Sequence, residues 1–397
     1  MTNISSGTPL VIGLGAVCSL GANIHEIWPR LCEGQLGIRP ITGFSREGLR
    51  TELAGWIEVG DIVQSTSRLE HFLVAALEEA LANAKLDANA CKEKRIGLVF
   101  GTSLGMSLVD PNLLPAPLDV MAGDGHNADL TMLADRLRLR FPFMSDIRVI
   151  SNACSSGTHA IGLAADMLKY EGFDVVVAGG ADVVDRLKYL GHTALGTLTT
   201  SLPCPYSRER SGTLFGEGAA FVVLQPDDVA GRADAYARCS GSGYSTDVQY
   251  LTAPDETGAG ASVAVRNALR EAGVAPIEID HINLHGSGTA LNDSAEFAAL
   301  QSVFGERISA IPSTSVKAAV GHLMGAAGAL EAVVTILSLH RATVPPTAQT
   351  QAEDLAFPID LVVGKPRALP NARHALSLSL GFGGTNGALI FSAVNAA

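Results

Sequence analysis

The segment Arg148-Val149-Ile150-Ser151-Asn152-Ala153-Cys154-Ser155-Ser156-Gly157 passes directly from an apolar, β-branched run into small and polar residues. The run predicts a strand over Arg148–Ser151, and the small residues predict a helix from Cys154 onward. A cysteine at such a junction faces the first amides and the positive end of the helix dipole, which favour a thiolate. A small, chemically inert buried cysteine is the open alternative, because free cysteines are commonly buried.

Short β-branched strands alternate with longer Ala- and Leu-rich helices along the rest of the chain. In the first half, strands are expected at Pro9–Val17, Arg95–Phe100, Asp174–Ala178 and Gly218–Leu224, with a helix at Arg68–Ala84. After a polar stretch, strands are expected at Tyr236–Ser240, His281–Leu284, Ala375–Ser379 and Ala388–Ser392, with helices at Ala261–Ala272, Asp293–Phe304 and after His322. This rhythm predicts an α/β protein with a mostly parallel sheet. The similar order in the two halves is compatible with an internal duplication.

Composition excludes several classes of function. The 397 residues are 47% hydrophobic and 17% charged, enough for a large core. The formal charge of −12 without a dense basic run disfavours binding of nucleic acid or of an anionic membrane. Six cysteines without C-x-x-C spacing argue against zinc and a disulfide framework, so a reducing cytoplasm is expected and no metal. Leu10–Val17 is expected as a buried strand, and Leu323–Leu339, which carries Glu331 near its middle, as a core helix.

A histidine follows the strand predicted before His285, in the segment His285-Gly286-Ser287-Gly288-Thr289. A glycine-rich loop at a strand end suits a catalytic imidazole, because its amides and hydroxyls can contact a ligand. The alternative is a structural histidine that bonds a local carbonyl, with Asp293 and Glu296 forming a helix-capping box.

Two more glycine-containing segments carry groups that could take part in catalysis. Lys317-Ala318-Ala319-Val320-Gly321-His322 stands at the mouth of an apolar helix, where the lysine and the helix N-terminus would lower the imidazole pKa and keep His322 a neutral N–H donor. Gly381-Phe382-Gly383-Gly384-Thr385-Asn386 is a glycine-dense turn whose amides could form an oxyanion hole. A capping histidine with a solvated lysine, and an ordinary tight hairpin, are the respective alternatives.

Together and in this order, the four segments resemble the elongating, Cys-His-His type of β-ketoacyl-acyl-carrier-protein synthase and the ketosynthases of type II polyketide systems. The resemblance covers almost the whole chain and includes Gly13–Val17, Val175–Asp182 and Gly216–Ala219. It implies the thiolase fold, in which two similar α/β halves form five α-β-α-β-α layers, usually in a dimer. Residues 1–234 would form the half with the nucleophilic cysteine, and residues 235–397 the half with both histidines.

The resemblance also implies a role for each site residue. Cys154 would be the nucleophile, His285 and His322 would act on the malonyl group, and Lys317 and Glu296 would support them. The amides of Cys154 and Phe382 would form the oxyanion hole. The residues implied to contact substrate are Ser287 and Thr289 on the pantetheine arm, Phe382 as a gate, and Leu380 and Met106 in the acyl pocket.

The chain departs from the family where relatives present basic residues to an acidic carrier protein. Pro111–Leu130 carries Asp119, Asp124 and Asp129 instead. Arg68 matches a basic family position. Another basic patch, or simply a solvated helix face, is offered by Arg136, Arg138 and Arg140.

The expected function is therefore decarboxylative condensation of an acyl thioester with malonyl-carrier protein, in fatty-acid, polyketide or aryl-polyene-type biosynthesis. The substrates would be carried on phosphopantetheine, with no other cofactor. The expected partners are an acyl carrier protein and a second copy or a related subunit, but neither nucleic acid nor membrane. Two alternatives remain: a non-catalytic subunit resembling chain-length factors, and an acyltransferase that uses Cys154 without condensation.

Overall fold

The computed structural model describes residues 7–60, 65–103, 130–227 and 234–394, and ten of its strands join in one order, β10-β9-β13-β14-β8-β1-β7-β6-β4-β5. The strands of the first half are β1 (Leu10–Val17), β4 (Ile96–Gly101), β5 (Met144–Ile150), β6 (Val175–Asp182) and β7 (Gly218–Gln225). Those of the second half are β8 (Ala237–Thr246), β9 (Ile279–Asn283), β10 (Ser313–Thr314), β13 (His374–Leu380) and β14 (Thr385–Ser392). The halves meet through a short antiparallel pairing of Leu10 and Val11 in β1 with β8.

The two halves repeat one topology. In the first, β4 pairs in parallel with β5 and β6, and β7 runs antiparallel to both β6 and β1. In the second, β9 pairs in parallel with β10 and β13, and β14 runs antiparallel to both β13 and β8. The prediction of a mostly parallel sheet is therefore wrong. The strand–helix rhythm does not reveal hairpins such as β13–β14, in which a tight turn makes the neighbours antiparallel.

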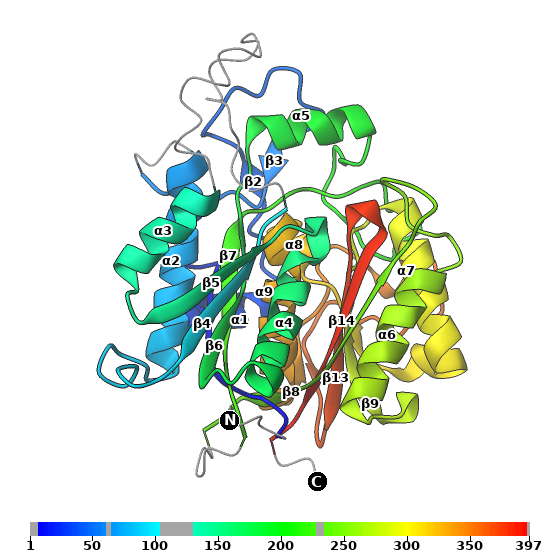
Figure 1. The fold of residues 1–397 in the computed structure, drawn as a ribbon. Helices are drawn as coiled ribbons and strands as arrows, with labels where there is room; N and C mark the ends of the chain where they lie inside the picture. Colours follow the sequence, from blue (N-terminus) through cyan, green and yellow to red (C-terminus); the bar gives the residue numbers. More distant parts are fainter. Residues whose placement is uncertain (1–6, 61–64, 104–129, 228–233, 395–397) are drawn as a thin grey trace.

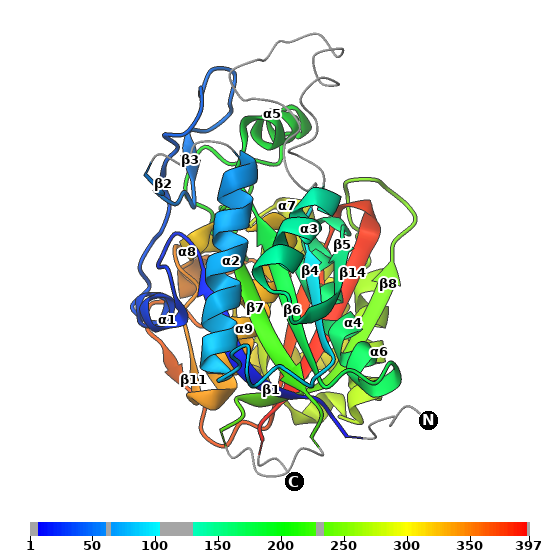
Figure 2. The ribbon, with the colours of Figure 1, turned by 60° about the vertical axis from the view of Figure 1, so that its left-hand side comes forward.

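The helices form three layers around the two half-sheets (Figure 1). Helices α2 (Ser65–Asn83) and α3 (Leu130–Arg140) cover the first half, and α6 (Ala259–Ala272) and α7 (Ala290–Phe304) lie outside the second. Between the halves, α4 (Ser156–Tyr170) and α9 (Ala327–His340) contact each other and strands on both sides. Figure 2 shows the same order from another side. The predicted α-β-α-β-α arrangement of two similar halves is confirmed.

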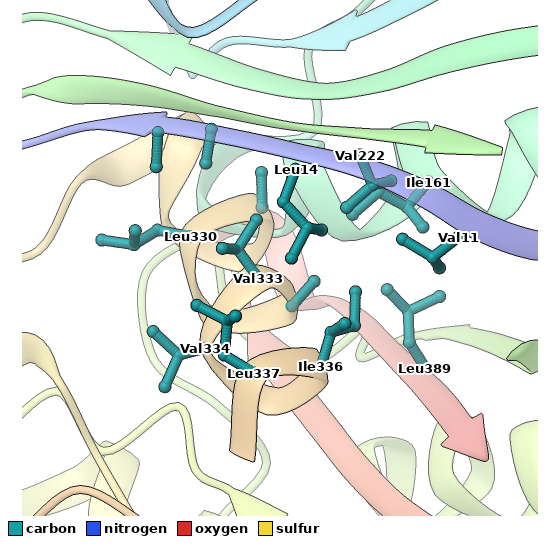
Figure 3. Close-up of a cluster of buried hydrophobic side chains, with 14 of the residues drawn as sticks. Val11, Leu14, Ile161, Val222, Leu330, Val333, Val334, Ile336, Leu337 and Leu389 are labelled. Carbon is teal, nitrogen blue, oxygen red and sulfur yellow. The ribbon is translucent and has the colours of Figure 1, made fainter. Parts of the chain in front are cut away.

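Helix α9 lies at the centre of the hydrophobic cluster between the two half-sheets. Figure 3 shows Leu330, Val333 and Ile336 among side chains from β1, α4, β7 and β14. Full burial of one such aliphatic side chain contributes about 2 kcal/mol, and almost every α9 residue is buried. The expected core helix is thus present, beginning at Ala327. Among the described residues, no helix has the length and apolar character that a membrane crossing requires.

Several shorter elements complete the described chain: α1 (Ile24–Cys32), α5 (Arg186–Leu195), α8 (Lys317–Val320), and the strand pairs β2 (Arg39–Pro40) with β3 (Leu53–Ala54) and β11 (Thr343–Val344) with β12 (Arg367–Ala368). Helix α5 was not expected from the sequence. Its signals are local: the Asp185 side chain accepts the N–H of Lys188, and Gly196, at φ 68°, ends the helix in the left-handed conformation.

The repeated topology determines where the candidate catalytic residues lie. The segment after β5 leads through Cys154 into α4, and the segment after the equivalent strand β10 leads through His322 into α9. Because α4 and α9 pack against each other between the half-sheets, the residues before them lie at the same end of the middle layer.

Candidate active site

A pocket of about 440 Å³ occupies this end of the molecule. Among the sequence-predicted site residues, seven line it: Cys154, His285, Ser287, Thr289, His322, Leu380 and Phe382. Lys317 and Glu296 lie behind this lining, 1% and 0% exposed. Met106 falls outside the described residues, as do Asp119, Asp124 and Asp129.

Cys154 lies in a single 3-10 turn, Ala153–Ser155, between β5 and α4. Ala153 has φ 49°, a left-handed conformation that costs a non-glycine residue energy and is held here by its surroundings. The Ser156 hydroxyl braces the turn: it accepts the N–H of Asn152 at 2.8 Å and donates to the Ala153 carbonyl at 2.6 Å.

The surroundings of Cys154 favour the protonated thiol. Burial raises its pKa to about 11, while the charge of Lys317 and a hydrogen bond from the Phe382 backbone N–H act in the opposite direction. Desolvation of the sulfur anion thus opposes the thiolate that the helix terminus and the nearby cation were expected to favour. The sulfur must lose its proton during the reaction.

His322 is held as a neutral ring with its proton on Nε2. The Met324 N–H donates to Nδ1 at 3.2 Å, so this nitrogen is an acceptor and Nε2 carries the hydrogen. Backbone bonds to Leu214 (2.7 Å) and from Gly216 (2.9 Å) fix the residue against the first half. Burial, and then the positive charge of Lys317, lower the pKa of His322 well below its usual value.

His285 is held in the same tautomer by another donor. The Lys317 ammonium lies 3.3 Å from Nδ1 and also donates to the His285 carbonyl, which leaves the ring hydrogen on Nε2. Burial, and then the positive charge of Lys317, lower the pKa of His285 well below 6.5. The two imidazole rings are 5.2 Å apart, edge to face.

Glu296 stabilises the loop that begins at His285 by accepting hydrogen bonds from its backbone. Its carboxylate accepts the N–H of His285 at 2.6 Å and that of Gly286 at 2.8 Å. Asp293 accepts backbone N–H groups of Tyr206 and Gly288. The capping-box alternative is wrong, since the side chain that caps α7 belongs to Thr289.

Glu331 is a site residue that the sequence reasoning missed. From the middle of α9 it forms an ion pair with Lys317, and both side chains are 1% exposed. The Ser379 hydroxyl donates to the second carboxylate oxygen at 3.4 Å. The solvated-lysine alternative is therefore wrong. The available signal was the single acid inside an apolar helix, because a buried carboxylate requires a cation or hydrogen-bond donors.

Ser287 and Thr289 lie side by side on the pocket wall. Their hydroxyl oxygens are 3.0 Å apart, and the Thr289 hydroxyl also accepts the Asn292 N–H at the start of α7. Hydroxyl groups in this position can hydrogen-bond an amide-bearing ligand arm.

Arg68 is part of the core rather than the surface. It is 4% exposed, forms an ion pair with buried Glu217, and places its guanidinium 3.9 Å from the Trp56 ring centroid. A guanidinium with these contacts is not available to a partner, so the basic family position that Arg68 matches does not offer a docking contact here. The arginines of α3 each have an acidic partner: Arg136 with Glu70, Arg138 with Asp135, and Arg140 with Glu78.

No group of three or more potential metal ligands occurs within the described part of the chain. The pocket instead brings together a thiol, two imidazoles locked as N–H donors and a backbone N–H that points at the sulfur. Such a set can form a thioester on sulfur and stabilise a developing negative charge on oxygen.

Comparison of the fold places the chain among the ketosynthases. It superposes on the structure titled "The ishigamide ketosynthase/chain length factor" with a TM-score of 0.85 and 30% identity, covering 98% of this chain and 100% of the other. It also superposes on a type II polyketide ketosynthase solved with its acyl-carrier protein (AntDE:AntF), with a TM-score of 0.88 and 26% identity over 98% and 100% of the chains. The predicted thiolase-like fold is confirmed.

Sequence comparison then identifies the family. Residues 10–230 match the N-terminal domain, and residues 236–351 the C-terminal domain, of beta-ketoacyl synthase. The chain is 31% identical to 3-oxoacyl-[acyl-carrier-protein] synthase 2 of Coxiella burnetii over 97% of this chain and 98% of that protein. It is 32% identical to the synthase of the same name from Vibrio cholerae, over 96% and 98%. The chain belongs to the β-ketoacyl synthase family, as its motifs indicate.

Proposed function

We propose that this protein is a β-ketoacyl-acyl-carrier-protein synthase that condenses a Cys154-bound acyl group with a malonyl thioester. The observation that carries the proposal is the convergence of one thiol and two neutral Nε2–H imidazoles on one pocket. Each group has a different task, and their sum is formation of a carbon–carbon bond.

The first half-reaction transfers the acyl group. The Cys154 sulfur attacks the carbonyl of an acyl thioester, loses its proton, and expels the carrier thiol, which takes up a proton. The backbone N–H of Phe382, which already points at this sulfur, and that of Cys154 would hold the oxyanion of the tetrahedral intermediate.

The second half-reaction forms the bond. The malonyl thioester loses carbon dioxide, and the two Nε2–H groups hold the enolate oxygen that develops. The enolate carbon attacks the acyl carbonyl, Cys154 leaves as a thiolate that is then protonated, and the β-ketoacyl product stays on the carrier. Neutral imidazoles suit this task because they donate a hydrogen bond without readily protonating the carbanion, and Lys317 favours the neutral form of both rings.

The relatives and structural neighbours support the choice of partners. Curated relatives are named 3-oxoacyl-[acyl-carrier-protein] synthases, one neighbour was solved with its acyl-carrier protein, and another, ApeO, with its chain length factor. We infer that this chain takes substrates from the phosphopantetheine arm of a carrier protein, works in the cytoplasm, and pairs with a second copy or a related subunit. Fatty-acid and polyketide pathways both fit.

We further propose that residues 1–234 and 235–397 act as two halves, with Ser287 and Thr289 contacting the pantetheine arm, and Leu380 and Phe382 the acyl chain. The two alternatives account less well for the site. A chain-length-factor-like subunit does not require Cys154, and a simple acyltransferase does not require two imidazole donors.

The test is product formation from defined substrates. An acyl thioester, malonyl-carrier protein and the purified chain should yield a β-ketoacyl-carrier protein two carbons longer, detected by mass spectrometry, and Cys154→Ala should yield none. If the acyl group is instead transferred from Cys154 to an added alcohol or amine without loss of carbon dioxide, the acyltransferase alternative holds.

A further inference from the structure

A third histidine, His192, enters the pocket from α5, which crosses the upper end of the molecule in Figure 1. None of the sequence motifs includes this residue. Its side chain is half-buried and lines the same pocket as Cys154 and His322.

The His192 ring is held by contacts on several sides. It stacks on Phe382 with ring centroids 5.2 Å apart and planes 20° from parallel, and it meets Phe215 edge to face at 4.5 Å. Nδ1 lies 2.8 Å from the Thr197 hydroxyl oxygen. The same hydroxyl oxygen lies 3.5 Å from the His192 carbonyl, and its hydrogen bond with Nδ1 anchors the ring on this side.

Phe382 lies in a glycine-rich turn whose backbone is hydrogen-bonded on both sides: the Gly381 N–H donates to the Thr385 carbonyl and the Gly383 N–H to the Leu251 carbonyl, both at 2.7 Å. Gly381 precedes it, and Gly383 and Gly384 follow at φ 79° and 74°. These glycine neighbours supply no side chains to pack on the Phe382 ring, so the stack with His192 contributes to the position of this residue. The same residue donates its backbone N–H to the Cys154 sulfur, and a displaced ring would carry that N–H with it.

We propose that His192 is a positioning residue: its imidazole holds the Phe382 ring by stacking and thereby keeps the Phe382 N–H directed at the reacting sulfur. This inference rests on the proposed function. A neutral ring is suited to the role, and burial lowers the pKa of His192 to about 4, so the imidazole is uncharged over the physiological range.

A positioning role for His192 predicts different effects on the two half-reactions. Phe382 contributes to acyl transfer, whereas release of carbon dioxide depends on His285 and His322. Loss of the His192 ring should therefore slow acylation of Cys154 and spare decarboxylation. A residue that merely maintains the fold would affect both reactions alike.

The test uses the full chain with His192→Ala, His192→Leu and His192→Phe. Acylation of Cys154 by octanoyl-N-acetylcysteamine is followed by mass spectrometry, and release of carbon dioxide from malonyl-coenzyme A is followed separately. We expect the Ala and Leu variants to acylate roughly three- to tenfold more slowly, the range expected from loss of one aromatic pair. The Phe variant, which keeps a flat ring, should recover most of the rate.

His340→Ala is the matched control, because this histidine also has an aromatic neighbour, Tyr236, but does not line the pocket. It should leave both reactions unchanged. Parental acylation by both the Ala and Leu variants, an equal loss in both half-reactions, or a Phe variant as slow as the Leu variant would each overturn the inference. A parent protein that neither acylates Cys154 nor releases carbon dioxide would instead remove the proposed function, and the inference with it.

Discussion

Lys317 and Glu331 form an ion pair in which each side chain is 1% exposed, and the same ammonium lies 3.3 Å from the Nδ1 of His285. The pair joins α8 to α9 and sets the tautomer of one proposed enolate donor. Removing one partner from such a pair leaves an uncompensated buried charge.

Glu331→Gln should therefore lower the free energy of unfolding by about 3–5 kcal/mol. Chemical denaturation followed by circular dichroism measures this. Glu306→Gln, at an exposed position, is the control and should change stability by less than about 0.5 kcal/mol. If the Glu331 variant were as stable as this control, other groups would be sufficient to stabilise the buried Lys317 ammonium without Glu331.

Alkylation of Cys154 should reflect a protonated thiol. With a pKa of about 11, the thiolate fraction, and hence the rate of modification by iodoacetamide, rises about tenfold per pH unit from pH 7 to 10. The measurement is the rate of mass increase at Cys154 across this range. A plateau below pH 9 would contradict the burial argument.

Decarboxylation of malonyl-coenzyme A should be insensitive to mild acid. Because the pKa values of His285 and His322 both lie well below 6.5, the rings remain neutral donors when an ordinary histidine would protonate. We expect a constant rate of carbon dioxide release from pH 8 down to about 6. A rate that halves near pH 6.5 would show that at least one ring titrates normally.

The close contact between α4 and α9 should not tolerate a methyl group. A Cβ at Gly157 would lie 2.8 Å from the Ala329 nitrogen and 3.0 Å from its Cβ, so Gly157→Ala should cost about 1–3 kcal/mol and displace the helix that follows Cys154. Gly191→Ala is the control, because nothing lies within 4 Å of its Cβ position. Thermal unfolding compares the two. An equal melting temperature for both variants would refute the argument.

The residues that sequence could predict are those with a local signature. Cys154, His285 and His322 each stand next to a predicted strand or helix, and the structure brings them to one pocket. The thiol pKa could not be predicted, because it depends on how deeply the turn is buried by segments far along the chain. Antiparallel pairing of β6 with β7 escaped prediction for a related reason, since the rhythm of elements does not fix strand direction.

The same limit of sequence-based prediction applies to three other residues: Glu331, His192 and Arg68. Glu331 was visible as a charge in an apolar helix, but its partner is set by the approach of α8. His192 lies on a helix that was not expected, and the role proposed for it depends on rings from two other segments. Arg68 matched a basic position in sequence, yet Glu217, 149 residues away, draws it into the core.

The most direct test of the central claim is carbon dioxide release from malonyl-coenzyme A by single-site variants. The account predicts that Cys154→Ala still releases carbon dioxide at a substantial rate, whereas His285→Ala and His322→Ala each lose roughly 10²- to 10³-fold, the effect of removing one oxyanion donor. Either histidine variant decarboxylating at the parental rate would contradict the role of the paired imidazoles.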